Sequence, residues 1–258
     1  MVPTGTAGVG RAAGPSGFMD ARRVFRLNQA IAKTGLCSRR NADRLIAAGR
    51  VGVNGRIVRE FNLEVDPSID ELTVDGKKLQ IKEYIYIAVY KPAGIVTTTL
   101  DEQGRTSILD ILPGNLRHLR PVGRLDMNSE GLLLVTNDGE LTQKITHPVH
   151  HMPKCYMVTV KGEVTEPDLK LMSSGVMLSD GPTLPAEVRL INRQKSSTIF
   201  ELTIREGRNR QIRRMCSQLG YPVSRLVRLS IGELQLGQMT PGSWRYLSPA
   251  EIRQLERR

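Results

Sequence analysis

Asp126 lies in a short loop whose neighbours are suited to holding a reactive carboxylate. The loop reads Gly123-Arg124-Leu125-Asp126, and a turn-forming Asn128-Ser129-Glu130-Gly131 leads from it into the apolar residues 132–135. An apolar run closed by an Asn-Asp-Gly turn predicts a buried strand, so the core would anchor one side of the loop. A carboxylate held in this way can serve as a nucleophile or as a general base. The commoner role of an aspartate in such a loop is to close the turn.

Two later segments could supply partners for this carboxylate. Tyr156 leads into a predicted strand over residues 157–160, and a tyrosine at the start of a strand is usually a packing residue. Residues 205–215 carry a run of arginines, and apolar residues at helical spacing predict a helix there that Gly220 closes. Arginines on such a helix are often only solvated. The residues alone therefore leave the roles of both segments open.

The segment 22–59 is the most one-sidedly basic part of the chain, with Asp43 as its single acidic residue. Two short helices are expected in it, the second capped by Ser38 and ended by Gly49, and a hairpin should turn at Asn54-Gly55. Arginines outside the apolar helix faces could contact an RNA backbone. A solvated basic surface is the alternative. The basic residues are Arg22, Arg23, Arg26, Lys33, Arg39, Arg40, Arg44, Arg50, Arg56 and Arg59.

The overall composition favours a polyanionic partner. The 258 residues contain 37 Lys and Arg against 26 Asp and Glu, a formal charge of +11, which attracts nucleic acid through counterion release and long-range steering. The three cysteines are far apart and form no metal-type pair, so a reducing cytoplasm is expected and a structural metal is not. No apolar run is long enough to cross a bilayer, so a membrane role is not expected.

Several motifs of the chain resemble those of one family of enzymes. Gly-Arg-Leu-Asp, Ser-Glu-Gly-Leu-Leu-Leu and Thr-Asn-Asp-Gly around Asp126, together with Glu-Gly-Arg-Asn-Arg-Gln-Ile-Arg-Arg-Met over residues 206–215, are similar to the signature of the RsuA/RluB/RluE/RluF family of ribosomal RNA pseudouridine synthases. Tyr156, preceded two residues earlier by a basic residue, matches the family's active-site tyrosine. The segments Gly35-Leu36-Cys37-Ser38-Arg39-Arg40 and Val53-Asn54-Gly55 resemble the alpha-L RNA-binding module named after ribosomal protein S-four.

The resemblance implies a role for each candidate residue. Asp126 would start cleavage of the glycosidic bond of a uridine, as nucleophile or as base, and Arg213 would pair with Asp126 and keep it ionised. Tyr156 would stack on the flipped base and help to remove the proton from carbon 5. No cofactor and no metal are required, and the protein is expected to act on rRNA as a monomer. Further RNA contacts are expected from Arg124, Arg208, Arg210, Arg26, Arg39, Arg40, Arg44, Arg50 and Asn54.

The expected fold class is α+β. A disordered extension is predicted over residues 1–21, an RNA-binding domain over 22–81, and a catalytic domain with a long, mainly antiparallel sheet over 82–258; a short helix is also predicted over 107–112. The resemblance is slightly closer to family members that act on large-subunit rRNA than to the small-subunit member. Two other functions stay open: an rRNA-binding module without catalysis, and a hydrolase that uses Asp126 and Glu130 as paired carboxylates on a glycosidic bond.

Overall fold

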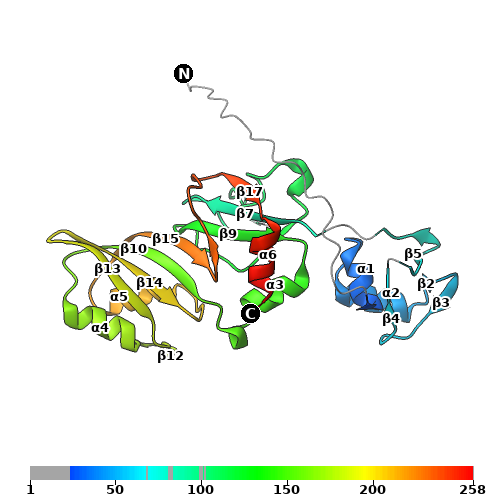
Figure 1. Ribbon diagram of the computed structural model, residues 1–258, viewed down its shortest axis with the longest axis horizontal. Helices are drawn as coiled ribbons and strands as arrows, with labels where there is room; N and C mark the ends of the chain where they lie inside the picture. Colours follow the sequence, from blue (N-terminus) through cyan, green and yellow to red (C-terminus); the bar gives the residue numbers. More distant parts are fainter. Residues whose placement is uncertain (1–23, 68, 81–83, 99–100, 102, 258) are drawn as a thin grey trace, which may run out of the picture. The chain divides into compact units, whose positions relative to one another are not determined.

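The chain forms two compact units, Met1–Glu83 and Tyr84–Arg258, in a computed structural model (Figure 1). The structure describes residues 24–67, 69–80, 84–98, 101 and 103–257. The extension predicted over residues 1–21 lies outside the described residues. The division between the units falls two residues after the predicted boundary at residue 81. That each unit is a domain with its own role stays a prediction.

The first unit combines two short helices with small antiparallel strands. Helix α1 (Leu27–Lys33) packs on α2 (Arg39–Ala47), and both bury their apolar faces in one core. The strands pair as β1-β4 and as a four-stranded sheet in the order β3-β2-β5-β6. They are β1 (Phe25–Arg26), β2 (Val51–Val53), β3 (Arg56–Val58), β4 (Glu64–Val65), β5 (Leu72–Val74) and β6 (Lys77–Lys78).

Local sequence signals explain the turns of this unit. The Ser38 hydroxyl accepts a hydrogen bond from the backbone N–H of Asn41 at 3.3 Å and so caps α2, as predicted. The β2–β3 and β5–β6 hairpins turn at Asn54 and Asp75, each with φ of 50°, and a glycine of positive φ follows each of them. Two consecutive positive φ angles are what a tight two-residue hairpin requires, and Asn-Gly and Asp-Gly supply them at little cost.

The second unit is built on a nine-stranded sheet in which β13-β14-β10-β15-β9-β7-β17 are neighbours in that order. Two further strands, β16 and β8, pair with β15 and β9. Among the described strands, β9 and β15 are the one parallel pair of this sheet. The predicted α+β class with a long, mainly antiparallel sheet is therefore confirmed. The strands are β7 (Tyr86–Lys91), β8 (Arg120–Pro121), β9 (Glu130–Thr136), β10 (Lys154–Lys161), β13 (Glu187–Gln194), β14 (Ser197–Ile204), β15 (Val223–Ile231), β16 (Leu234–Gln235) and β17 (Trp244–Tyr246).

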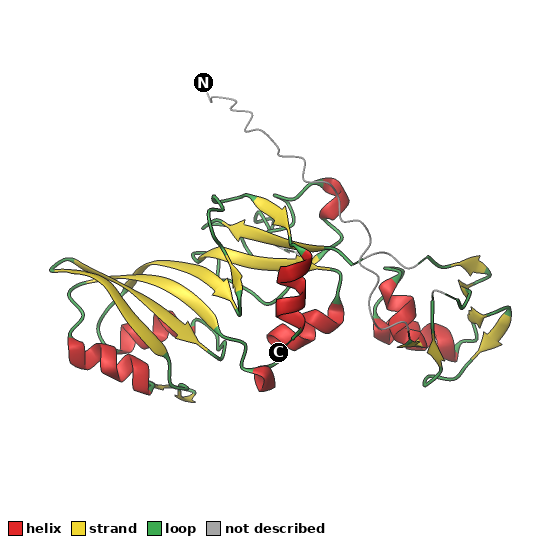
Figure 2. Cartoon of the chain, in the orientation of Figure 1, coloured by secondary structure: helices red, strands yellow, loops and turns green. Residues whose placement is uncertain are grey.

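Helices flank the two halves of this sheet. Figure 1 shows α4 and α5 beside the half made of β13, β14 and β10, and α3 and α6 beside the half made of β9, β7 and β17; Figure 2 separates helices from strands by colour. Two short helical turns, η1 and η2, and a small hairpin, β11–β12, complete the described part of this unit. In chain order, the helices, helical turns and hairpin strands are η1 (Gly114–Leu116), α3 (Gly139–Thr146), η2 (Pro148–His150), α4 (Glu166–Ser174), β11 (Met177–Leu178), β12 (Gly181–Pro182), α5 (Gln211–Gln218) and α6 (Pro249–Glu256).

The parallel junction between β9 and β15 depends on a glycine. Gly131 lies opposite Arg228 in the register and has a φ of 103°. A Cβ atom on Gly131 would lie 2.3 Å from the backbone oxygen of Arg228, so no larger residue fits there. This close approach brings the start of β9, and with it the preceding loop, directly beside β15.

One predicted helix is not formed. Ser107 forms an isolated bridge with Val96, residues 108–111 form turns, and the helical turn η1 follows only at Gly114–Leu116. The Asp110 carboxylate accepts hydrogen bonds from both the backbone N–H and the hydroxyl of Ser107, at 2.7 and 2.8 Å. These side-chain bonds offer the backbone an alternative to a helix.

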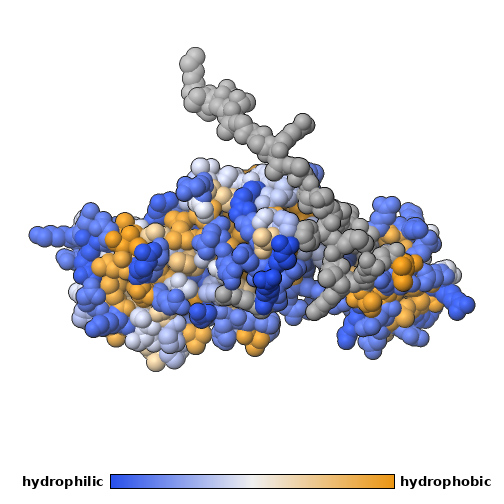
Figure 3. Space-filling model, viewed as in Figure 1, coloured by the Kyte–Doolittle hydropathy of each residue, from blue (hydrophilic) through white to orange (hydrophobic). Residues whose placement is uncertain are grey.

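Hydrophilic residues cover most of the visible face of both units in Figure 3, with smaller apolar areas between them. Within the described part of the chain, none of the helices is long and apolar enough to cross a membrane.

Candidate active site

Asp126 lies on the loop that leads from β8 into β9. Residues 132–135 of β9 are fully buried, so the core anchors one side of the loop, as the sequence predicts. The Asp126 side chain is 32% exposed, and its Oδ2 lies 3.7 Å from Nη1 of Arg210. The carboxylate is thus partly desolvated, paired with a cation and still open to a substrate.

The backbone of this loop is held from both sides, because each carbonyl oxygen from residue 125 to residue 129 accepts a hydrogen bond. A loop fixed in this way presents its side chain in one position, which a catalytic carboxylate requires. The bonds run from Thr97 Oγ1 to Leu125 O (2.9 Å), Ser129 N to Asp126 O (3.0 Å), Gly94 N to Met127 O (2.8 Å), Lys91 Nζ to Met127 O (3.2 Å) and Ser129 O (2.8 Å), and Arg213 Nη2 to Asn128 O (2.8 Å).

Lys91, the last residue of β7, is the central donor of this arrangement. Its side chain is fully buried, and its ammonium group donates to the carbonyls of Pro92, Met127 and Ser129. Three acceptors match the three N–H donors of an ammonium group. Burial lowers the pKa of Lys91 to about 8, while the charge of Asp126 acts in the opposite direction. The lysine therefore holds the loop and adds a positive charge close to Asp126.

The predicted ion pair between Arg213 and Asp126 is not formed. Arg213, on α5, donates to Asn128 O at 2.8 Å and to Ser129 Oγ at 3.4 Å, while Arg210 is the residue that pairs with Asp126. Arg213 is the third residue of α5, the helix that begins directly after Arg210, and its guanidinium reaches the turn that follows Asp126. The charge of Asp126 still raises the pKa of Arg213, against the larger lowering by burial. Arg213 thus belongs to the site and braces the loop.

Arg210 owes its position to an unusual backbone conformation. It is the residue just before α5 and has a φ of 48°, in the left-handed region that residues other than glycine rarely adopt. The Glu206 carboxylate accepts from Arg208 Nε at 3.0 Å and from Gln211 Nε2 at 2.6 Å, and Gln211 Oε1 accepts from the backbone N–H of Arg208 at 3.1 Å. This network fixes the loop that turns the Arg210 side chain toward Asp126.

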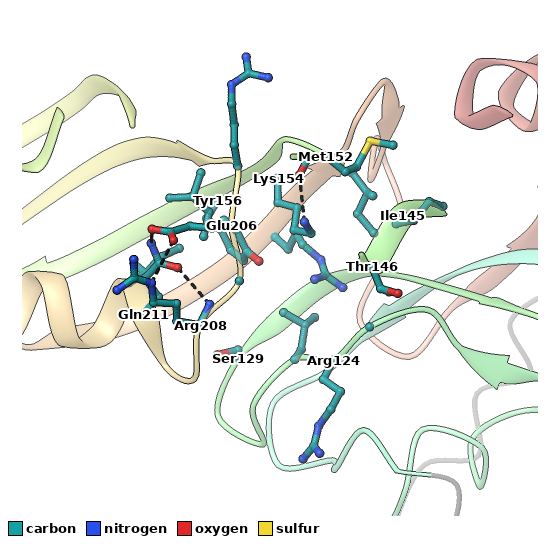
Figure 4. A pocket seen from close by; sticks show the side chains of 18 of the residues that line it. Arg124, Ser129, Ile145, Thr146, Met152, Lys154, Tyr156, Glu206, Arg208 and Gln211 are labelled. Atoms are coloured by element: carbon teal, nitrogen blue, oxygen red, sulfur yellow. Dashed lines mark hydrogen bonds and ion pairs between the residues drawn. The ribbon is translucent and has the colours of Figure 1, made fainter. Parts of the chain in front are cut away.

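The candidate residues of the second unit line one cavity of about 230 Å³. This is below the roughly 300–1,000 Å³ that drug-sized ligands occupy, and it suits a single nucleoside. Figure 4 shows Tyr156 and Lys154 side by side in the cavity wall, whereas the Arg124 side chain points away from both. The charged residues that line the cavity are two carboxylates, Asp126 and Glu206, and seven cations: Arg124, Lys154, Arg205, Arg208, Arg210, Arg213 and Arg228. Seven cations and two carboxylates make the cavity suited to an anionic substrate.

Tyr156 lies on β10, opposite Arg228 of the neighbouring strand β15. It is 7% exposed and lines the cavity together with Asp126 and Ile212. A tyrosine ring on a rigid strand offers a flat surface for stacking with a base. The structure therefore places the three predicted catalytic residues around the same cavity.

Glu130 does not line this cavity among the residues that the structure describes. Its carboxylate accepts from Nε and Nη2 of Arg225 at 3.0 and 3.2 Å and from the Tyr90 hydroxyl at 3.4 Å. The Arg225 bonds hold the pKa of Glu130 below its usual range. The arrangement of two facing carboxylates that a glycosidic hydrolase would use is thus not formed by Asp126 and Glu130.

All six predicted RNA contacts of the first unit are exposed: Arg26, Arg39, Arg40, Arg44, Arg50 and Asn54. Two of them also hold turns of the unit. Arg50 Nε donates to Asp75 Oδ1 at 2.7 Å, and the Asn54 amide donates to Asp70 at 2.8 Å and accepts from the backbone N–H of Glu71 at 2.9 Å. Their exposure leaves all six side chains accessible to an RNA strand.

Lys91, Lys154 and Arg228 belong to the site although the sequence did not select them as candidate residues. A signal was present at two of them, because Lys91 ends the otherwise apolar strand β7 and Lys154 is the basic residue two positions before Tyr156. Charged residues are almost never fully buried without a partner. The described residues contain no group of three His, Cys, Asp or Glu side chains arranged to hold a metal ion.

Known proteins share both parts of this architecture. Residues 85–218, about half of the chain, match the family model of RNA pseudouridylate synthases, and residues 25–68 match that of the S4 domain. The chain is thus an isomerase that carries an RNA-binding S4 domain. It belongs to the RNA pseudouridylate synthase family, as the resemblance of its motifs predicted.

Relatives match along most of the chain. It is 39% identical over 231 residues to an uncharacterized RNA pseudouridine synthase of Aquifex aeolicus, covering 89% of this chain and 93% of the relative. It is 39% identical over 232 residues to ribosomal large subunit pseudouridine synthase B of Bacillus subtilis, covering 89% and 95%. A crystal structure of a pseudouridylate synthase superimposes with a TM-score of 0.65 at 33% identity, covering 89% of this chain and 99% of that one.

Proposed function

We propose that the chain isomerises a uridine of large-subunit ribosomal RNA to pseudouridine, with Asp126 as the catalytic group. The observation that carries this proposal is the state of the Asp126 carboxylate. Asp126 and Glu206 are the two carboxylates in the described lining of the cavity. Glu206 is occupied by Arg208, Gln211 and the backbone N–H of Leu184. Asp126, held 3.7 Å from Arg210, is left available for chemistry.

The isomerisation breaks the bond between N1 of uracil and C1′ of ribose and makes a bond between C5 and C1′. N1 gains a proton and C5 loses one, so no electrons enter or leave. Asp126 starts the cleavage, and the ion pair with Arg210 at 3.7 Å helps to orient its carboxylate. Tyr156 stacks on the uracil while the base turns. Arg213 and Lys91 hold the loop so that the carboxylate stays at the reacting sugar or base.

The target class is supported by the relatives and by charge. Relatives from Bacillus subtilis and Salmonella typhimurium are named ribosomal large subunit pseudouridine synthase B. The first unit presents Arg26, Arg39, Arg40 and Arg44 to solvent, and exposed arginines on a small rigid module suit contacts with a folded RNA backbone. We expect rRNA to bind through this module while one uridine enters the cavity of the second unit.

The experiment is a map of pseudouridines in both rRNAs of a strain that lacks this protein. One large-subunit position should lose its pseudouridine, and the wild-type gene should restore it. A gene encoding Asp126→Asn, expressed to the same level, should not restore it. A lost position in small-subunit rRNA would redirect the target, and an unchanged map in both rRNAs would contradict the proposal.

A further inference from the structure

Two cations in the cavity wall have no acidic partner within the described part of the chain. Lys154, on β10, donates from Nζ to the carbonyl of Met152 at 2.9 Å and takes part in no ion pair among the described residues. Arg228, on β15, is 2% exposed and donates from Nε to Leu132 O at 2.7 Å. Its Nη2 is buried without any hydrogen-bond partner. A buried guanidinium normally has its donors satisfied, so the Nη2 group of Arg228 still has the capacity to donate to a bound acceptor.

The two side chains lie next to each other in the same wall. Tyr156 is opposite Arg228 in the register of β10 and β15, and Lys154 is two residues before Tyr156 on the same strand. All three line the cavity. Burial lowers the pKa of Lys154 to about 8, and the charge of Arg228 contributes to this lowering. The two cations therefore repel each other in a partly desolvated site.

The carboxylates of the cavity do not compensate this charge. Asp126 pairs with Arg210, and Glu206 is bound by Arg208 and Gln211. A neutral uracil carbonyl could accept a hydrogen bond here but would leave both positive charges without a counter-charge. A phosphodiester group supplies a full negative charge and oxygen acceptors for both side chains.

We propose that Lys154 and Arg228 form a binding subsite for one backbone phosphate of the RNA strand whose uridine enters the cavity beside Asp126. The subsite rests on the proposed function, because its occupant is an RNA strand. It adds a contact that holds the sugar-phosphate backbone at the catalytic centre, separate from the exposed arginines of the first unit. Because Tyr156 and Asp126 line the same cavity as these cations, a phosphate held there would fix the ribose relative to Asp126.

The test compares two probes of the same size on the full-length chain. One is the uridine trinucleotide with its two natural phosphodiesters, and the other is its uncharged methylphosphonate analogue. Dissociation constants are measured by NMR titration for the wild type and for Lys154→Met, which keeps an unbranched side chain and removes its charge. We expect Lys154→Met to weaken binding of the natural trinucleotide about tenfold, as the loss of one charge-assisted hydrogen bond implies. Binding of the analogue should not change.

A matched control and a second variant complete the design. Lys161, at the other end of β10, is exposed and does not line the cavity among the described residues, so Lys161→Met should leave both dissociation constants unchanged. Lys154→Arg keeps the cation and should retain most of the preference for the charged probe. Circular dichroism reports whether each variant is folded. If Lys154→Met is unfolded, the proposal is decided by Lys154→Gln, which shortens the side chain but keeps a polar end.

Equal weakening of both probes by Lys154→Met or Lys154→Gln would show that the residue contacts base or ribose and would overturn the subsite. No weakening of either probe would overturn it as well. Neither outcome involves turnover. If Lys154→Met weakens binding of the charged trinucleotide alone while the rRNA map of the deletion strain is unchanged, the proposed function is refuted and the subsite stands. If the map loses one pseudouridine but Lys154→Met does not weaken binding of the charged trinucleotide selectively, the subsite alone is refuted.

Discussion

Replacement of Lys91 by methionine tests whether the Asp126 loop has to be held for catalysis. Methionine keeps an unbranched, flexible stem without the ammonium group, which suits a side chain that is 0% exposed. The substitution removes the three hydrogen bonds from Nζ to the carbonyls of Pro92, Met127 and Ser129. Met127 O keeps a second donor, the backbone N–H of Gly94 at 2.8 Å. Two carbonyls therefore lose the donor that holds them.

The expected change in stability is small because two terms oppose each other. The carbonyls of Ser129, which is buried, and of Pro92, which is partly buried, are left without a donor, at a cost of about 1–3 kcal/mol each. The lysine itself is unfavourable in this position, since the fall of its pKa from 10.5 to about 8 corresponds to roughly 3 kcal/mol at ~1.4 kcal/mol per unit. The free energy of unfolding should therefore fall by only about 1–2 kcal/mol. Turnover should fall by about a hundredfold, because a shift of ~1 Å in a catalytic group has an effect of this size.

The assay is pseudouridine formation under single-turnover conditions at saturating rRNA fragment, alongside a urea unfolding curve. The control is Lys170→Met, which changes an exposed lysine of α4 and should leave both measurements unchanged. Full turnover in Lys91→Met would refute the view that Lys91 positions Asp126. A loss of stability well above the expected value would show that the defect is one of folding.

Three further expectations concern backbone fit, pH and RNA affinity. Gly131→Ala should lower the free energy of unfolding by roughly 2–4 kcal/mol, because its Cβ would meet the backbone of β15 at 2.3 Å; Gly139→Ala, with open space around it, should not destabilise the chain in the same urea unfolding experiment. Because the pKa of Lys91 is about 8 in the folded state, below its ordinary 10.5, the unfolded chain binds more protons between these values and this group adds stability as pH rises through them. Turnover at saturating RNA should nevertheless fall above about pH 8, since a neutral amine has lost one donor to the loop; a flat profile up to about pH 9.5 would contradict this role. Arg39→Ala with Arg40→Ala should flatten the log–log salt dependence of RNA binding, measured by filter binding, by about one unit for each phosphate that the protein no longer neutralises, and an unchanged slope would refute their role.

Much of the fold follows from local patterns in the sequence. The buried strand predicted over residues 132–135 lies within β9 (Glu130–Thr136), because an apolar run closed by a turn is a strong signal. The turns at Asn54 and Asp75 follow from the Asn-Gly and Asp-Gly pairs. The failed helix over residues 107–112 has a local cause as well, since Asp110 binds Ser107 through its side chain. Such side-chain bonds compete with helix formation in ways that composition does not reveal.

The site was only partly predictable because its geometry depends on contacts between distant segments. Motifs identified Asp126, Tyr156 and Arg213, and all three line the cavity. The partner of Asp126 is Arg210, because the left-handed backbone at this residue turns its side chain toward the loop. A φ value of this kind cannot be seen in an arginine-rich sequence. Lys91 likewise acts on a loop 36 to 38 residues further along the chain.

The central claim is that Asp126 carries out the chemistry, and Asp126→Asn tests it most directly. An amide keeps the shape of the side chain but can neither attack carbon nor accept a proton at neutral pH. The assay is release of tritium from rRNA fragment labelled at C5 of uridine, with pseudouridine identified by nucleoside analysis and RNA affinity measured in parallel. The account predicts unchanged affinity and a rate at least about a thousandfold below the wild type. Tritium release and pseudouridine formation at the wild-type rate in Asp126→Asn would contradict it.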